Sequence, residues 1–303
     1  MNKVSVVLPT YNCGTYVGVA VESVLQQTYS NYELIIVNDG STDETDQALA
    51  PYLCNNGHIR YIKQGNKGHA GARNTGIRAA TGDVIAFIDS DDKWLPEKLG
   101  EQVQAMEEDP EVGLVHCNVY GFGENQEVQV RGPLLTQEQL QGYSGYIFDN
   151  LYFRKIIITT TTVMIRKSCI DDVGMFDENM TRYGSEDREL FLRILWKYKA
   201  RYVNKPLAMY RNRSDSEGQN YERMIKGQEY VYEKITSLYG LPQSSKRAVM
   251  SKMYQEWARE FYAKGRFADG LTNQVKAIRA NPIDMNAYFA LKRYARFLFS
   301  RAT

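Results

Sequence analysis

The sequence predicts an α/β fold in which helices cover both faces of a mostly parallel β-sheet, followed by an all-helical extension. Short apolar runs alternate with helical periodicity over the first 120 residues, as expected for parallel strands joined by crossover helices. Residues 121–135 are then rich in glycine, and from about Asp215 onward only helical periodicity remains. We therefore expect an α/β domain over residues 1–215, with halves at 1–120 and 121–215, and a helical extension over 216–303.

The elements of the N-terminal half follow in order from the apolar pattern. A first helix is predicted from the spacing of Val17 to Leu25, and a second from Ser41 and Glu44, which have the spacing of a capping box. A third is predicted over Ala70–Ala80, and a fourth near Pro96, because proline suits the first turn of a helix. The predicted strands are Val4–Leu8, Leu34–Val37, Ile59–Ile62, Val84–Ile88 and Val112–Val119.

The later elements are less regular. Residues 121–135 predict a loop or an edge excursion, and the β-branched run Ile156–Ile165 predicts a buried strand. A helix over Ser185–Tyr198 and a final strand over Tyr202–Arg211 follow. Tyr254–Pro282 predicts a helical hairpin, either a plain one packed on a core or one of tetratricopeptide type.

Composition narrows the function classes. The chain has 303 residues and a formal net charge of +1, which argues against broad nucleic-acid binding. The four cysteines are scattered without a CxxC pair, so neither a zinc knuckle nor a disulfide framework is predicted. The N-terminal apolar run is too short for a signal peptide, and no segment reaches the roughly 18 apolar residues of a membrane span. We expect a cytoplasmic protein, either soluble or peripheral at the inner face of the membrane.

Three carboxylates directly follow the fourth predicted strand, in Asp89-Ser90-Asp91-Asp92. Like charges this close raise each other's pKa values unless a cation neutralises them. Carboxylate oxygens suit Mg²⁺ or Mn²⁺, and open α/β sheets bind ligands beyond the carboxyl ends of their strands. The motif predicts a divalent metal site, and solvated acids at the start of the next helix are the alternative.

Polar residues also follow the first two strands. Asp39, in VNDGSTD, would face the same edge of the sheet, where its carboxylate can accept a hydrogen bond from a base N–H or a ribose hydroxyl. Tyr11 belongs to a group at the end of the first strand, and its ring could flank a nucleobase. That group is Pro9, Thr10, Tyr11 and Asn12. These residues predict a nucleotide site, although turn and cap roles would explain each motif taken alone.

The segment NKGHAGARN, residues 66–74, opens the third predicted helix. Small residues such as Gly68 let a helix approach the sheet closely, and Arg73 would then point toward the strand ends, where it could bind a carboxylate or phosphate. No GxGxxG follows the first strand, which argues against an NAD-dependent dehydrogenase.

Together and in this order, the motifs resemble glycosyltransferase family 2, whose fold is called GT-A. They are VSVVLPTYN, VNDGSTD, NKGHAGARN, FIDSDD and the later Tyr183-Gly184-Ser185-Glu186-Asp187, and the resemblance covers roughly residues 3–215. It implies a Rossmann-like nucleotide-diphospho-sugar transferase that inverts the anomeric centre. The expected donor is a UDP-sugar, and the expected cofactor is Mn²⁺ or Mg²⁺.

The resemblance also implies residue roles. Asp187 corresponds to the catalytic base of the family, with Glu186 beside it. Asp89 and Asp91 form the DxD pair, and Asp91 or Asp92 is the expected direct metal ligand. The nucleotide-binding set implied by the resemblance is Pro9, Thr10, Tyr11, Asn12, Asp39, Gly68, Arg73, Asp89, Ser90 and Asp91.

One position departs from the family pattern. Many members have a histidine shortly after the last strand, where this chain has Arg213 in the sequence Tyr210-Arg211-Asn212-Arg213. An arginine could hold the diphosphate by charge instead of ligating a metal. The third metal ligand therefore stays open, with Arg211 and Glu217 as further candidates.

Family habit implies a glycan or lipid-linked acceptor in surface polysaccharide biosynthesis. Ala290–Arg301 alternates apolar and basic residues, which fits a helix on a membrane surface and equally a solvated helix. The helical extension is also a candidate surface for homo-oligomer contact. The alternative functions are a sugar-1-phosphate nucleotidyltransferase and a catalytically inactive sugar-nucleotide-binding scaffold.

Overall fold

The computed structural model describes residues 2–54, 57–123, 128–130, 135–213 and 220–292. The chain forms two compact units. The first comprises Met1–Leu151, Ile156–Arg182 and Glu186–Glu217, and the second comprises Tyr152–Lys155, Tyr183–Ser185 and Gly218–Thr303. The predicted domain boundary at 215/216 falls in residues 214–219, which lie outside the described residues, so this boundary stays a prediction.

Four parallel strands form the N-terminal half of the sheet in the first unit, in the order β3-β2-β1-β4. They are β1 (Val4–Thr10), β2 (Tyr32–Asn38), β3 (Ile59–Lys63) and β4 (Val84–Phe87). The predicted α/β class is confirmed, because β1 and β2 are each followed by a helix and then by a parallel neighbour, and the helix after β3 leads to β4, which pairs parallel with β1.

The rest of the sheet mixes strand directions. The short strand β8 (Met164–Arg166) lies antiparallel between β4 and β6 (Val112–Phe122), and β9 (Lys199–Arg211) runs parallel to β6. Two further short strands pair antiparallel with these long ones: β5 (Lys93–Trp94) with β9, and β7 (Val128–Val130) with β6. Within the predicted loop or edge excursion at residues 121–135, residues 121–122 end β6 and Val128–Val130 form β7, whereas residues 124–127 and 131–134 lie outside the described residues.

Helices cover both faces of the sheet because β1 sends alternate side chains to opposite sides. Leu8 packs in one core with α1 (Gly14–Leu25), α2 (Thr45–Leu53) and α4 (Lys98–Glu107). Val7 points the other way, toward α3 (Gly68–Ala79), where a Cβ added at Gly76 would lie 2.3 Å from Val7 Cγ1. The remaining helices of this unit are α5 (Gln137–Leu140), η1 (Thr160–Thr162), α7 (Lys167–Val173), η2 (Glu178–Arg182) and α8 (Glu186–Lys197), with α6 (Phe148–Tyr152) ending at the unit boundary.

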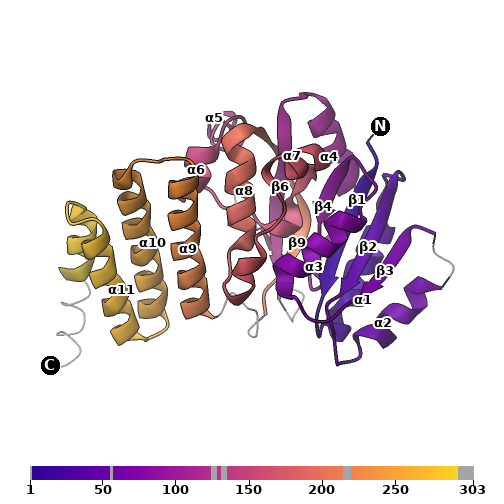
Figure 1. Ribbon diagram of the computed structural model, residues 1–303, viewed down its shortest axis with the longest axis horizontal. Coiled ribbons are helices and arrows are strands. Elements are labelled where there is room, and N and C mark those ends of the chain that lie inside the picture. The colour runs from indigo at the N-terminus through magenta and orange to yellow at the C-terminus, as the bar shows by residue number, and fades with distance from the viewer. Residues whose placement is uncertain (1, 55–56, 124–127, 131–134, 214–219, 293–303) are drawn as a thin grey trace. The chain divides into compact units, whose positions relative to one another are not determined.

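The second unit is helical, as predicted for the C-terminal extension. Helices α9 (Tyr221–Leu238), α10 (Gln243–Ala263) and α11 (Phe267–Ala280) lie side by side (Figure 1), and residues 285–292 are also helical. The predicted hairpin is confirmed as α10 and α11. Among the described residues, no helix has the length and apolar content required to cross a bilayer.

The predicted buried strand Ile156–Ile165 is wrong for most of its length. Only its last two residues belong to a strand, β8, and Thr160–Thr162 form the 3₁₀ turn η1. The Thr162 hydroxyl donates to Thr159 O at 2.7 Å, and the backbone N–H of Thr162 donates to the same carbonyl at 2.9 Å. Such local bonds give threonine an alternative to a strand ladder.

Two predicted helix starts are also corrected. Helix α2 begins at Thr45 without a side-chain cap from Glu44, and Ser41 Oγ instead accepts the backbone N–H of Asn12 at 3.0 Å, so the predicted capping box is absent. Helix α4 begins at Lys98, and Pro96 lies before its first turn. In both cases, tertiary hydrogen bonds around the strand ends decide where the helix begins.

Candidate active site

The carboxyl ends of β1, β2 and β4 meet at one edge of the sheet. Thr10 pairs with Asn38 in register, and the backbone N–H of Asp39 donates to Thr10 O at 2.9 Å. On the other side of β1, the backbone N–H of Ile88 donates to Val7 O, so residues 89–92 follow β4 toward the same edge. The sequence motifs at the ends of the three strands therefore share the position where an open α/β sheet binds ligands.

Asp39 lies almost completely buried at this edge, with 3% of its surface exposed. Its Oδ1 accepts Gln64 Nε2 at 2.6 Å, and its two carboxylate oxygens accept the Lys67 N–H at 2.9 and 3.1 Å. Gly40 has φ 82°, a conformation that glycine adopts without strain and that lets the chain turn directly after this residue. The carboxylate thus ties the end of β2 to the residue that precedes α3.

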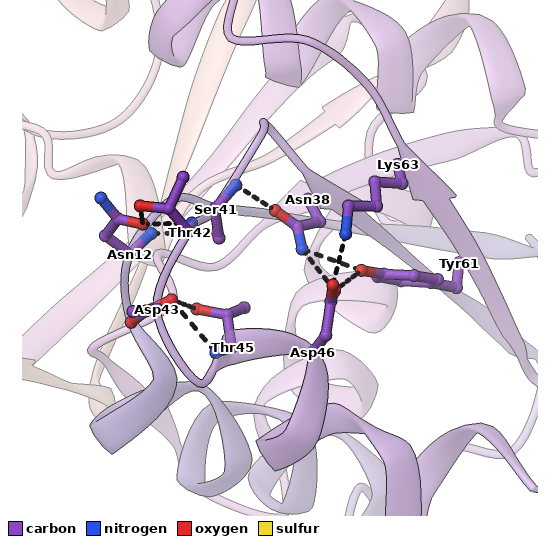
Figure 2. Close-up of polar contacts among 9 residues, drawn as sticks. All are labelled: Asn12, Asn38, Ser41, Thr42, Asp43, Thr45, Asp46, Tyr61 and Lys63. Carbon is purple, nitrogen blue, oxygen red and sulfur yellow. Dashed lines mark hydrogen bonds and ion pairs between the residues drawn. The ribbon is translucent and has the colours of Figure 1, made fainter.

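Two polar clusters hold the loops after β1 and β2 (Figure 2). Asn12 Oδ1 accepts the Thr42 N–H at 2.8 Å, which adds to the Ser41 contact of the Asn12 backbone. Asn38 Oδ1 accepts the Ser41 N–H at 2.9 Å, and Asn38 Nδ2 donates to Asp46 Oδ1 at 2.7 Å. These bonds fix the loop that carries Asp39.

The Asp46 carboxylate closes the second cluster. It also accepts hydrogen bonds from Lys63 Nζ and from the Tyr61 hydroxyl, and both bonds lower the pKa of Asp46 (Figure 2). Burial and this carboxylate together raise the pKa of Tyr61 to about 12. The cluster braces the ends of β2 and β3 beside the Asp39 loop.

Two other predicted site residues lie at this edge of the sheet: Tyr11 directly follows β1, and Gly68 is the first residue of α3. The Tyr11 side chain is 50% exposed and offers a free aromatic face. Gly68 opens α3 with φ 72°, and a Cβ there would lie 2.3 Å from the methyl carbon of Thr181. Only glycine fits at this helix start.

Arg73 bonds carboxylates from two later sequence motifs, which lie 16 and 113 residues further along the chain. Its Nη2 donates to Asp89 Oδ1 at 2.8 Å, and its Nη1 donates to Glu186 Oε1 at 2.5 Å. Burial opposes the charge, but the carboxylates of Asp89 and Glu186 raise the pKa of Arg73 further, so the guanidinium stays charged. Its side chain is only 5% exposed, which makes Arg73 a positioning residue here, and direct contact with a nucleotide stays a prediction.

Asp187 lies next to this ion pair, at the start of α8. Its Oδ2 accepts the Thr160 hydroxyl at 3.0 Å, and its Oδ1 accepts the Arg188 N–H at 2.7 Å. Burial and the neighbouring Glu186 raise the pKa of Asp187, while Arg73 opposes the rise. The result is a carboxylate with increased basicity that keeps partial access to solvent.

Asp92 is buried behind the acidic motif. It is 1% exposed, its Oδ1 accepts the Arg211 N–H at 2.9 Å, and its Oδ2 has no hydrogen-bond partner among the described residues. Burial, Asp89 and Asp91 raise its pKa well above the usual aspartate range. Asp92 therefore anchors the end of β9.

Asp91 is more accessible and differently paired. Its Oδ2 lies 3.3 Å from Arg213 Nη1, and burial and Asp89 raise its pKa. Ser90, between the two acids, bonds the Cys13 thiol. Among the described residues, no group of three His, Cys, Asp or Glu side chains could hold a metal ion, so the predicted set of Asp89, Asp91 and Asp92 does not converge as a complete ligand sphere.

The sequence did not predict a buried group of side chains that bonds the carbonyls of the η1 turn. Trp94 Nε1 donates to Thr161 O at 2.9 Å, and Gln102 Nε2 donates to Thr162 O at 2.7 Å. Lys98 Nζ donates to Gln102 Oε1 at 2.6 Å and lies 4.0 Å from the centre of the Trp94 ring. The spacing of Lys98 and Gln102, one turn apart just after the acidic motif, was the available signal.

The histidines do not converge on this edge. His58 and His69 are exposed, and His116 is buried, where desolvation lowers its pKa to about 4 and its Nε2 contacts Tyr143 O. Glu217, a further candidate for the metal, lies outside the described residues.

Comparison with known proteins agrees with this geometry. The family model for glycosyl transferase family 2 matches residues 5–174. A glycosyltransferase of Rickettsia bellii (strain RML369-C) is 32% identical over 214 residues, 71% of this chain and 29% of that protein. Glycosyltransferase GlyG of Streptococcus pneumoniae serotype 4 is 33% identical over 223 residues, 70% of this chain and 72% of GlyG. The chain thus spans less than a third of the Rickettsia protein and most of GlyG.

Two solved structures share the fold. S. aureus TarS 1-349 in complex with UDP-GlcNAc matches with a TM-score of 0.66 at 18% identity, covering 92% of this chain and 81% of that chain. The mannosyltransferase PcManGT from Pyrobaculum calidifontis, in complex with GDP-Man and Mn²⁺, matches with a TM-score of 0.64 at 18% identity, covering 98% of this chain and 81% of that chain. At this identity the likeness shows the fold, and the predicted GT-A class is confirmed.

Proposed function

The chain belongs to glycosyltransferase family 2, and from that premise we propose that it transfers a sugar from a nucleoside diphosphate sugar to an acceptor hydroxyl. The observation that carries the proposal is the position of Asp187. This partly exposed carboxylate, with a raised pKa, lies beside an ion-paired acidic cluster at the carboxyl edge of the sheet. A general base is expected in such an environment.

The donor's nucleoside would bind at the loops after β1 and β2. The Asp39 carboxylate can accept one further hydrogen bond, from a base N–H, and the exposed Tyr11 ring offers a stacking face. A UDP-sugar is the proposed donor, since uracil carries such an N–H. UDP-GlcNAc bound to TarS and GDP-Man bound to PcManGT make uridine and guanosine nucleotides the first ones to compare.

Asp91 would hold Mn²⁺ or Mg²⁺, because carboxylate oxygens suit both ions. Its side chain is 25% exposed and its contact with Arg213 is 3.3 Å long, whereas Asp89, at similar exposure, is bonded to Arg73 at 2.8 Å and Asp92 is buried. When bound, the cation would act as a Lewis acid on the departing diphosphate.

The transfer itself would use Asp187. Its carboxylate takes the proton of the acceptor hydroxyl while the oxygen attacks the anomeric carbon, and the bond from that carbon to the diphosphate oxygen breaks with its electron pair going to the diphosphate. A single displacement of this kind inverts the anomeric centre. Thr160 and the backbone of Arg188 hold the two carboxylate oxygens in place during the reaction.

The proposed acceptor is a hydroxyl of a glycan or of a lipid-linked glycan. Most of the predicted membrane-contacting segment, residues 290–301, lies outside the described residues, so membrane contact, the cytoplasmic location and an oligomer through the helical extension all stay predictions.

The test combines a donor screen with Asp187→Asn. UDP-, GDP- and dTDP-sugars are first ranked by thermal shift with Mn²⁺, because specific binding stabilises the native state. Transfer or donor hydrolysis is then measured for the wild type, Asp187→Asn and the control Asp171→Asn, whose side chain is 61% exposed on α7. We expect Asp187→Asn to lose about 10²–10⁴-fold in turnover with nucleotide affinity unchanged.

Several outcomes would contradict the proposal. Equal loss in the control, or loss of nucleotide binding in Asp187→Asn, would remove the base role. Pyrophosphate release from a nucleoside triphosphate would indicate a nucleotidyltransferase, and binding without any turnover would indicate a scaffold.

A further inference from the structure

Arg213 lies beside Asp91 because hydrogen bonds hold the nearby Arg211 against Asp91 and Asp92. The Arg211 N–H donates to Asp92 Oδ1 at 2.9 Å, and Arg211 Nε donates to Asp91 O at 2.8 Å. Two residues further on, Arg213 Nη1 lies 3.3 Å from Asp91 Oδ2. The ion pair is therefore fixed by the fold and is not an incidental contact between two long surface side chains.

The Tyr16 ring of α1 gives Arg213 a second anchor. The guanidinium carbon of Arg213 lies 4.7 Å from the ring centre, and that of Arg211 lies 4.6 Å from the same centre. Cation–π contacts at these distances are attractive and do not depend on the carboxylate. The Tyr16 ring can therefore keep Arg213 at this edge of the sheet when a cation displaces it from Asp91.

Asp91 is the carboxylate of the motif that a cation can reach. The side chains of Asp89 and Asp91 are similarly exposed, at 27% and 25%, and Asp92 is 1% exposed. Asp89 is bonded to Arg73 at 2.8 Å, whereas the contact of Asp91 with Arg213 is longer, at 3.3 Å. Arg213 contacts one oxygen of this carboxylate, Oδ2. A divalent cation bound at Asp91 would lie next to the guanidinium, and the repulsion between the two positive charges would weaken the ion pair.

We propose that Arg213 competes with the divalent cation for Asp91 and transfers to the donor's diphosphate when metal and nucleotide bind together. This inference rests on the proposed function, which supplies the diphosphate. Two cations cannot share one carboxylate oxygen without strong repulsion. A displaced guanidinium carries N–H donors in a geometry that matches phosphate oxygens. Metal and nucleotide therefore bind cooperatively, because the metal replaces Arg213 as the partner of Asp91 and the diphosphate replaces Asp91 as the partner of Arg213.

The experiment is isothermal titration of the full chain with three probes: Mn²⁺ alone, UDP in EDTA, and UDP with Mn²⁺, with GDP as the second nucleotide. We expect Arg213→Gln to bind Mn²⁺ alone about threefold to fivefold more tightly, since a partly exposed ion pair no longer competes. With Mn²⁺ present the same variant should bind UDP about tenfold more weakly than the wild type, since charge-assisted bonds to phosphate are lost, whereas in EDTA, where Arg213 stays paired with Asp91, the difference should be smaller. Arg213→Lys keeps the charge and should bind Mn²⁺ like the wild type.

The control is Arg78→Gln, which removes a 52% exposed guanidinium paired with Glu178 and should change none of the affinities. Unchanged Mn²⁺ affinity in Arg213→Gln would overturn the competition, and unchanged UDP affinity in the presence of Mn²⁺ would overturn the transfer to diphosphate. Arg213→Met carries the same expectations if the glutamine variant does not fold. If neither UDP nor GDP binds the wild type with Mn²⁺, the proposed function fails, while the Mn²⁺-only comparison still decides the competition.

Discussion

Thr160→Val should move the pH dependence of the transfer by a predictable amount. The substitution preserves shape but removes the hydroxyl that donates to Asp187 Oδ2 at 3.0 Å. A hydrogen bond to an ionised group contributes about 1.5 kcal/mol, and one pKa unit corresponds to roughly 1.4 kcal/mol. The bond favours the ionised carboxylate, so its loss should raise the already raised pKa of Asp187 by about one further unit.

The sign of the effect on activity follows directly. Asp187 acts as a base only when ionised, so activity is present above its pKa in the folded protein and is lost as the pH falls through that value. In Thr160→Val, the acid limb of the profile of kcat/KM against pH should therefore move to higher pH by about one unit, with the plateau at high pH much less affected.

The assay is nucleotide release from the identified donor, measured between pH 4.5 and 9. Thr162→Val is the matched control, because its hydroxyl lies in the same turn but donates to Thr159 O and not to Asp187. An acid limb that stays in place in Thr160→Val, or that moves equally in Thr162→Val, would refute the assignment of Asp187 as the base held by Thr160.

Three further predictions concern stability. Arg73→Met leaves Asp89 and Glu186 without their partner and should lower the free energy of unfolding by about 3 kcal/mol in urea, whereas Arg78→Met on the exposed side of α3 should change it by less than about 1 kcal/mol. The pKa of Asp92 is raised in the folded protein, so ionisation of this carboxyl destabilises the fold once the pH rises above the pKa of Asp92 in the unfolded chain. Asp92→Asn should therefore melt about 2–4 °C above the wild type at pH 7.5 and show no gain at pH 4. Burial lowers the pKa of Lys98 to about 8, so its contribution to stability should rise as the pH increases from about 8 to about 10, and the difference in unfolding free energy between the wild type and Lys98→Met should show this slope. A flat difference would mean that Lys98 keeps its ordinary pKa.

The local sequence determined the positions of the main strands and the ligand-binding edge of the sheet. Short apolar runs such as Val4–Leu8 that alternate with helical periodicity favour buried parallel strands, and in a parallel sheet the residues that follow each strand reach the same edge. This is why the sequence alone predicts that Asp39 and the acidic motif after β4 lie near one another. The resemblance of the motifs then added the family, which the comparisons bear out.

Tertiary structure decided the pairings within that edge. The β-branched run at Ile156–Ile165 has strand propensity, yet Thr160–Thr162 form a turn. The hydroxyl and N–H of Thr162 bond the nearby Thr159 O, and the side chains of Trp94 and Gln102 donate to the carbonyls of Thr161 and Thr162. Ser41 has the spacing of a cap, but its hydroxyl bonds Asn12 from another loop. No local pattern contains these distant partners.

The charged residues show most clearly which features the local sequence determines and which features only the tertiary structure determines. The sequence supplied Asp91, Asp187 and Arg73 as candidates, because residue type and position relative to a strand are local properties. It could not show that Arg73 bonds Asp89 and Glu186, or that Arg213 bonds Asp91, because these partners lie between 16 and 122 residues apart. Electrostatic energies depend on distance and burial in space, and only the folded chain sets both.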